Sequence, residues 1–146
     1  MGKSLPNLPD LIIFNISTLG TYINQAGNRI CHEKEFNLEM DQLPLLMLLY
    51  YTEFDSQQSI ADALMRNKAS VARTVSYLLK CGYVHISPGP DKRKNSIRLS
   101  DKGMKIAAEV EKSIFNLEDK LLSEFNGAEV KRIKQLLMKL ISVFQK

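Results

Sequence analysis

Residues 67–103 read NKASVARTVSYLLKCGYVHISPGPDKRKNSIRLSDKG, and this stretch decides the fold. Its first part has the apolar spacing of an amphipathic helix over 68–80, whose inner face is predicted to carry Val71, Val75, Leu78 and Leu79. Asn67 is a favourable N-cap for that helix, and Gly82 lies where a helix C-terminal glycine is expected. The pattern therefore predicts a short helix with defined ends.

The second part of the stretch predicts a β-hairpin. Residues 83–86 and 96–99 are rich in β-branched and aromatic side chains and alternate in polarity, which favours two paired strands. The residues between them, 87–95, contain two prolines, a glycine and three consecutive basic residues. They predict a turn-rich, positively charged loop.

Two helices are predicted before this stretch. Asp55 and Ser56 can cap a short helix over 57–65, whose inner side carries Ile60, Ala61 and Leu64. An earlier helix over 41–54 tolerates Pro44 in its first turn and is apolar on nearly all sides. We expect this earlier helix to be the central buried one, and the two short helices to form a helix-turn-helix.

The two ends of the chain predict three long amphipathic helices. The first starts near Asp10 as N-cap and has apolar residues at 12, 16, 19, 23, 26 and 30. The second follows a cap at Ser100, continues to Phe125 and is ended by Asn126-Gly127, and the third covers 128–145. Such long apolar seams at both chain ends predict a homodimer interface.

The whole chain has the composition of one globular domain. It has 146 residues, of which 45% are hydrophobic and 25% charged, so it can bury a core without a disulfide or a metal. No apolar run reaches the roughly 18 to 20 residues of a membrane span, and residues 1–9 lack a secretion-signal pattern. We expect a cytoplasmic protein with no membrane partner and with Cys31 and Cys81 as free thiols.

The positive charge is concentrated in the middle of the chain. The net charge is +4, but residues 60–105 hold ten basic and three acidic residues, a net charge of +7, against −4 for residues 1–59 and +1 for residues 106–146. A basic helix-turn-helix with a hairpin suits duplex DNA, because the major groove admits a helix and the minor groove attracts an inserted Arg or Lys.

The helix over 68–80 has a polar outer face of small, hydroxyl and cationic side chains. They are Lys68, Ala69, Ser70, Arg73, Ser76, Tyr77 and Lys80. Such side chains suit phosphate contacts and hydrogen bonds to base edges, and Arg73 can bind a guanine with two hydrogen bonds. The candidate DNA-binding set is completed by the loop residues Asp91, Lys92, Arg93 and Lys94.

These residues resemble the multiple-antibiotic-resistance regulator (MarR) family of winged helix-turn-helix transcription regulators. The resemblance is carried by Val71-Ala72-Arg73, by residues 78–84, by Asp91-Lys92-Arg93 and by residues 97–103. It implies that Arg73 is the recognition-helix arginine, and that Asp91 and Arg93 are the Asp-x-Arg pair of the wing, with Arg93 in the minor groove. The chain departs from the family at Ile86 and Ser87, where many members have a basic residue, and at Tyr77, which is commonly charged.

The expected fold is mainly α with a small β-hairpin wing, in a single domain over 1–146. Residues 41–103 are expected to bind DNA, and residues 1–33 and 104–146 to be dimerisation helices. The resemblance further implies a sequence-specific transcription repressor that acts as a homodimer on a pseudo-palindromic operator and responds to a small-molecule effector. Tyr22, Tyr50 and Tyr51 are candidates for lining an effector cleft, with core or rim positions as the alternative. The competing function is a dimeric winged-helix module for protein interaction without specific DNA binding.

The sequence predicts neither an enzyme nor a metal site. Cys31-His32-Glu33 has ligand-type side chains, but three adjacent helix residues cannot all point at one ion, and Cys81 and His85 are the only other Cys and His residues. No phosphate-binding glycine loop and no nucleophile with a histidine base is evident. We expect no catalytic residue, no metal and no cofactor, and a redox role of Cys31 or Cys81 stays open.

Overall fold

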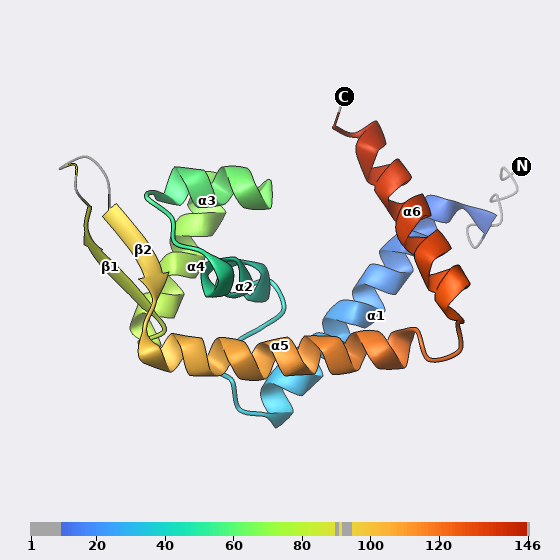
Figure 1. Ribbon diagram of the computed structural model, residues 1–146, viewed down its shortest axis with the longest axis horizontal. Helices are drawn as coiled ribbons and strands as arrows, with labels where there is room; N and C mark the ends of the chain where they lie inside the picture. The colour runs from blue at the N-terminus through green and yellow to red at the C-terminus, as the bar shows by residue number, and fades with distance from the viewer. Residues whose placement is uncertain (1–9, 90, 92–94, 146) are drawn as a thin grey trace, which may run out of the picture. The chain divides into compact units, whose positions relative to one another are not determined.

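The computed structural model describes residues 10–89, 91 and 95–145 of the chain. In that part the elements follow in the order α1 (Ile12–Glu33), α2 (Leu43–Tyr51), α3 (Gln57–Leu64), α4 (Lys68–Lys80), β1 (Val84–Pro88), β2 (Asn95–Leu99), α5 (Asp101–Leu121) and α6 (Gly127–Val143) (Figure 1). The predicted class, mainly α with one antiparallel hairpin, is confirmed. The chain divides into two compact units, Met1–Glu111 and Lys112–Lys146, and each is described by itself.

The core of the first unit surrounds α2, as predicted. Leu45, Leu46 and Leu49 of this helix are fully buried. They belong to one apolar cluster with residues of α3, α4, β2 and the first part of α5, among them Ile60, Val71, Val75, Leu78, Ile97, Ala107 and Val110. The short helices and the hairpin are therefore held on a common apolar centre.

The predicted bounds of α2, 41–54, are wrong at both ends, and the correction at Phe54 matters for the hairpin. The Phe54 N–H donates to the Ile97 carbonyl at 3.1 Å, and the Ile97 N–H donates to the Phe54 carbonyl at 2.7 Å. Backbone that pairs with a strand cannot also belong to a helix, so the helix ends at Tyr51. The pairing ties β2 to the segment that follows α2.

Both ends of α4 are fixed as the sequence predicts. The Asn67 side chain accepts a backbone N–H of the first turn at 2.7 Å. At the other end Gly82 has φ +76°, and the N–H groups of Gly82 and Tyr83 donate to the carbonyls of Leu79 and Leu78, which is a Schellman motif. The inner-face prediction is wrong for Leu79, which is 40% exposed because it lies at the edge of the apolar stripe.

The turn between α3 and α4 is tight. Ser56 caps α3 by accepting the Ser59 N–H at 3.0 Å, which confirms the predicted start. The helix ends at Leu64, and Met65 has a left-handed φ of +54° that redirects the chain. The two helices thus form the predicted helix-turn-helix, with α3 and α4 in contact.

The hairpin is displaced slightly from its predicted bounds. Its register runs from Val84 opposite Leu99 to Pro88 opposite Asn95, rather than over 83–86 and 96–99. Tyr83 lies outside β1 because its N–H completes the end of α4. At the far ends, strand pairing continues into residues predicted as loop.

Ser100 joins the hairpin to α5. Its Oγ accepts the Gly103 N–H at 2.9 Å and donates to the Gly82 carbonyl at 2.5 Å, while its N–H donates to the Tyr83 carbonyl at 2.9 Å. Gly103 lies so close to the Tyr83 carbonyl that a Cβ would have no room. The predicted cap at Ser100 is therefore confirmed, and it also fastens the base of the hairpin.

Helix α1 begins two residues after the predicted cap at Asp10. Its N-cap is Leu11, which makes no side-chain capping bond. Only Gly27 and Cys31 of α1 are buried, whereas its apolar residues at 12, 13, 14, 16 and 19 are exposed. The helix is followed by the segment 34–42, called here the α1–α2 loop, in which Glu35 and Asn37 have left-handed φ values of +56° and +59°.

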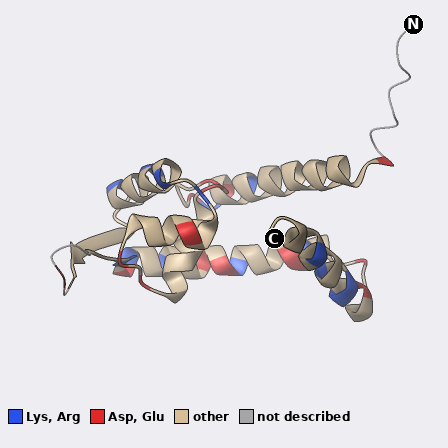
Figure 2. Cartoon of the chain, turned by 90° about the horizontal axis from the view of Figure 1, so that it is seen from above, with Lys and Arg blue, Asp and Glu red and all other residues tan. Residues whose placement is uncertain are grey.

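The second unit contains the end of α5 and all of α6. Asn126 does not end the fifth helix, as predicted, but begins the sixth: it forms a capping box with Glu129, and α5 already ends at Leu121. None of the described α6 side chains is buried, and one side of the helix exposes Leu137, Leu140 and the following Phe144. Figure 2 shows that α6 also carries several Lys and Arg residues.

Candidate nucleic-acid interface

The outer face of α4 presents most of the predicted side chains together. Lys68, Ala69, Arg73, Ser76 and Lys80 are exposed on this helix, opposite its buried valines. The structure gives no hydrogen bond or ion pair between any of these side chains and another described residue. Because the helix is anchored from within and its outer side chains are uncommitted, they are available to a partner.

Ser70 and Tyr77 lie at the edges of this face. Ser70 is half-buried; its N–H bonds to the Asn67 cap and its carbonyl accepts the Thr74 hydroxyl at 3.2 Å. The backbone of Ser70 is therefore engaged in hydrogen bonds of the first turns of α4. Its side chain lies at the edge of the outer face.

Tyr77 departs from the expectation that it faces outward freely. It is half-buried, and its hydroxyl donates to the Asn37 carbonyl at 2.6 Å. Burial is the main cause that raises the pKa of Tyr77, followed by its contact with the Cys81 thiol. The phenol therefore connects α4 to the α1–α2 loop, a pairing that helix periodicity does not reveal.

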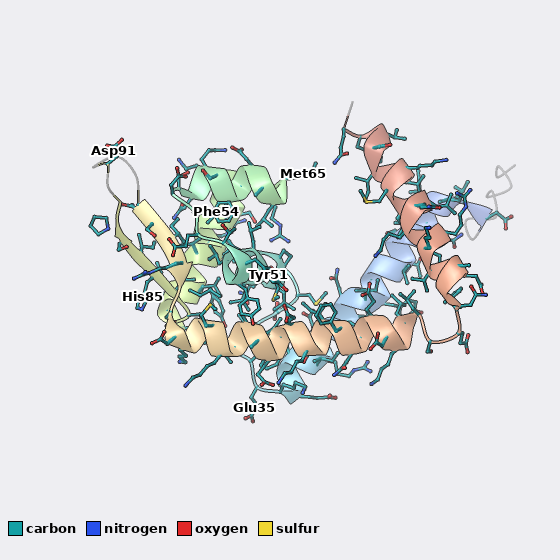
Figure 3. All side chains as sticks on the ribbon, viewed as in Figure 1. Glu35, Tyr51, Phe54, Met65, His85 and Asp91 are labelled. Carbon is teal, nitrogen blue, oxygen red and sulfur yellow. The ribbon has the colours of Figure 1, made fainter. Side chains whose placement is uncertain are left out.

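The predicted loop residues can be placed only in part. Asp91 is exposed at the tip of the hairpin (Figure 3). Lys92, Arg93 and Lys94 lie outside the described residues. The structure therefore gives the base and direction of the hairpin, from Val84 and Leu99 to Pro88 and Asn95.

Two basic side chains of the hairpin were missed by the sequence reasoning. His85 and Arg98 are directly opposite each other in the strand register, and both are exposed. Figure 3 labels His85 on β1. Strand alternation could have found them, because directly paired residues point to the same side of a hairpin. They line a cavity of about 540 Å³ with Tyr50, Tyr51 and Glu53, called here the hairpin-base cavity.

The hydroxyl of Tyr51 at this cavity is committed to the Glu111 carboxylate, and this hydrogen bond is the main cause that raises the pKa of Tyr51. Tyr22, the third predicted cleft residue, is exposed on α1 and does not belong to the described lining of the hairpin-base cavity. Two of the three predicted tyrosines therefore meet at one cavity.

The described residues were also compared with the patterns of a metal-ligand cluster and of a membrane-spanning helix. They contain no group of three or more His, Cys, Asp or Glu side chains that could hold a metal ion. None of the helices within them is long and apolar enough to cross a membrane. Both cysteines are free, with Cys31 buried and Cys81 half-buried.

The whole fold matches known structures closely. A MarR/EmrR family transcriptional regulator from Acinetobacter sp. ADP1 superposes with a TM-score of 0.83 and 28% identity, covering 97% of this chain and 100% of that one. A MarR transcriptional regulator from Methanosarcina mazei Go1 has a TM-score of 0.78 and 25% identity, covering 90% of this chain and 94% of that one. MepR from S. aureus, solved as a DNA complex, has a TM-score of 0.81 and 20% identity, covering 91% of this chain and 98% of that one.

Comparison of the sequence with family models and with curated proteins gives no match. The structural likeness nevertheless extends over nearly the full length of each neighbour and includes the helix-turn-helix, the hairpin and the long terminal helices. The chain accordingly has the fold of the MarR-family winged helix-turn-helix transcriptional regulators, and this similarity supports the family resemblance seen in the sequence.

Proposed function

We propose that this protein binds duplex DNA through α4 and the hairpin and represses transcription as a ligand-responsive homodimer. The observation that carries the proposal is the uncommitted outer face of α4, with Arg73 and Lys80 exposed on a helix whose inner face is buried. A helix of this kind enters the major groove, where Arg73 can bind a guanine. The neighbour MepR, solved with DNA, supports the same use of the fold.

The proposed contact set has three parts. Arg73, Ser76 and Ala69 read base edges, and Lys68, Ser70 and Lys80 contact phosphates. The loop residues Asp91, Lys92, Arg93 and Lys94 form the wing, with Arg93 in the minor groove. Tyr77 contributes by holding α4 against the α1–α2 loop, since its hydroxyl already has a partner.

We assign residues 41–103 to DNA binding and residues 1–33 and 104–146 to dimerisation. The support lies in the apolar side chains that α1 and α6 expose, including Ile13 on α1 and Leu140 and Phe144 at α6. Exposed apolar side chains that recur along a helix, as they do on each of these two helices taken by itself, are typical of an interface. A second copy is the proposed occupant, because two recognition helices about 34 to 36 Å apart then fit a pseudo-palindromic operator. Sedimentation equilibrium at micromolar concentration tests this assignment, and a monomer would contradict it.

The effector is proposed to enter the hairpin-base cavity. Its volume of about 540 Å³ suits a small molecule, and Arg98 and His85 offer it cationic and hydrogen-bonding groups beside the rings of Tyr50 and Tyr51. A ligand there contacts the base of the hairpin and the end of α2 at once, so it can shift the wing relative to the helix-turn-helix. Thermal-shift titration with small aromatic carboxylates tests the site, and Arg98→Gln should remove any shift.

DNA binding is tested by fluorescence anisotropy with a duplex from the upstream region of the gene and a shuffled duplex, over a series of salt concentrations. Tight, salt-dependent binding that favours the native duplex by roughly a thousandfold is expected. Arg73→Ala should weaken specific binding by about 1 to 3 kcal/mol, and Arg93→Ala should weaken binding to both duplexes and lower the salt slope by about one.

The matched control is Lys34→Ala, which removes an exposed cation in the α1–α2 loop, outside the ranges assigned to DNA binding and dimerisation, and should leave both affinities unchanged. If neither Arg73→Ala nor Arg93→Ala changes binding, the groove assignment is wrong and the protein-interaction module becomes the better interpretation. Repression itself is tested by in vitro transcription from the promoter that carries the bound duplex.

A further inference from the structure

A second cavity lies where the end of α1 meets the α1–α2 loop. Its volume is about 680 Å³, and its lining comes from α1 (Asn28, Cys31 and His32), from the loop and from Tyr77 of α4. This loop cavity shares no lining residue with the hairpin-base cavity. Its volume falls within the range of small-molecule sites.

The charge of the loop cavity is negative. Its described lining includes the carboxylates of Glu35 and Glu39 and contains no lysine or arginine. The charge of Glu39 adds to burial in raising the pKa of Cys31, and it is also one of the smaller causes of the raised pKa of Tyr77. The negative charge of Glu39 therefore acts on both Cys31 and Tyr77, which lie on different elements that line the cavity. A cation placed between them would be attracted.

The remaining lining offers hydrogen-bond acceptors beside an aromatic ring. The Asn37 carbonyl accepts the Tyr77 hydroxyl at 2.6 Å, and a carbonyl oxygen has a second lone pair for another donor. The buried Leu38 and Cys31 supply an apolar side, and Tyr77 adds an aromatic side chain to the lining, a group that attracts cations. A planar organic cation with N–H donors satisfies all of these groups together.

We propose that the loop cavity binds a small organic cation carrying N–H donors, and that its occupation is coupled to α4 through the contact between Asn37 and Tyr77. A donor on the cation that bonds to the second lone pair of the Asn37 carbonyl shares this acceptor with the Tyr77 hydroxyl, so binding weakens the bond that attaches α4 to the loop. The proposal that the cation binds is supported by the residues of the loop cavity and does not depend on DNA binding. The effect of the cation on DNA affinity rests on the proposed function.

The binding step is tested with benzamidinium, neutral benzamide and anionic benzoate, which have nearly the same shape. Each is titrated into the full chain while backbone and side-chain amide NMR shifts are followed. Benzamidinium should bind at least about tenfold more tightly than either of the others, because charge-assisted hydrogen bonds are the strong ones, and it should shift the amides of Asn28, Asn37 and Gln42.

Two matched variants locate the charge that is responsible. Glu39→Gln keeps the size of the side chain and should weaken benzamidinium binding by about tenfold, whereas Glu33→Gln, at an exposed carboxylate outside the described lining of the cavity, should leave it unchanged. Equal affinities for the three probes, shifts confined to other residues, or equal losses in the two variants would each overturn the site.

The coupling step is tested separately by DNA anisotropy at constant ionic strength. Saturating benzamidinium should lower the affinity for the specific duplex several-fold while benzamide does not, and Tyr77→Phe should abolish the difference between the two probes. No effect of benzamidinium on DNA binding, with the NMR result intact, would overturn the coupling. Failure of the protein to bind DNA at all would instead refute the proposed function and leave the cation-binding result unaffected.

Discussion

Replacing Ser100 by alanine tests how the hairpin is attached to the rest of the first unit. Ser100 is only 6% exposed, and its Oγ makes two hydrogen bonds, one accepted from Gly103 at 2.9 Å and one donated to the Gly82 carbonyl at 2.5 Å. The first is an N-cap bond, whose loss costs about 1 kcal/mol. The second is an internal side-chain hydrogen bond worth about 1 kcal/mol net. The expected loss of unfolding free energy is therefore about 2 kcal/mol.

The assay is urea unfolding followed by far-ultraviolet circular dichroism, at one fixed protein concentration because association adds to stability. For a chain of this size the loss corresponds to a fall in Tm of roughly 4 to 8 °C. The control is Ser123→Ala: Ser123 is exposed and its hydroxyl donates only to the Lys120 carbonyl at 3.0 Å, so the change should stay within about 0.5 kcal/mol. Equal effects of the two substitutions would refute the role given to Ser100.

Three further substitutions give independent checks. Gly103→Ala forces a Cβ against the Tyr83 carbonyl and should destabilise the protein by about 1 to 3 kcal/mol in urea unfolding, and a neutral result would contradict the close approach. Met65→Gly should stabilise it by up to about 1 kcal/mol, because a left-handed φ of +54° costs a side-chain residue more than glycine; a loss of stability would show that the Met65 side chain matters more than its backbone. Burial raises the pKa of Cys31 above its ordinary 9.0, so the folded state favours the neutral thiol. The resulting contribution to the unfolding free energy is fully present below pH 9, and it is lost as the pH rises through the raised pKa of the folded state. The difference in unfolding free energy between wild type and Cys31→Ala should therefore shrink above pH 9, and a constant difference would argue against a buried thiol.

The parts of the fold that could be predicted are those with local signals. Asn67 and Ser56 make side-chain bonds to amides three residues away, and Gly82 adopts a left-handed conformation that glycine favours. These bonds lie within a few residues of each other, so the sequence displays both partners at once. The buried inner face of α4 was also predicted correctly from the spacing of its apolar residues, except for Leu79 at its margin.

The errors arose where the decisive partner is distant in sequence. Phe54 leaves the helical pattern because it pairs with Ile97, and Tyr77 turns to the Asn37 carbonyl, which is 40 residues away. Neither contact leaves a periodic trace. The mistake at Asn126 is different: an asparagine followed by glycine can end one helix or begin the next, and only Glu129, three residues on, identifies the capping box.

The candidate site divides in the same way. The outer face of α4 follows from helix geometry, and the structure gathers Lys68, Ala69, Arg73, Ser76 and Lys80 on it. The cross-strand pair of His85 and Arg98 also has a simple geometric signal, but it needs the strand register. The predicted bounds placed the first strand one residue early at its start and two residues early at its end, and the second strand one residue late at its start. The two cavities required the complete tertiary structure, because each is lined by several elements.

The separation of the two faces of α4 has a consequence for how such regulators diversify. Among the thirteen residues of α4, the inner positions are engaged in packing and the ends are capped. The side chains of the outer positions make no packing contact or hydrogen bond that the described part of the chain needs for folding. Mutations at Ala69, Arg73 or Ser76 can therefore accumulate without loss of folding, and natural selection or a directed library can search new operator sequences at little risk to the scaffold. A duplicated gene can in this way acquire a new set of target promoters within a few substitutions while retaining the same fold.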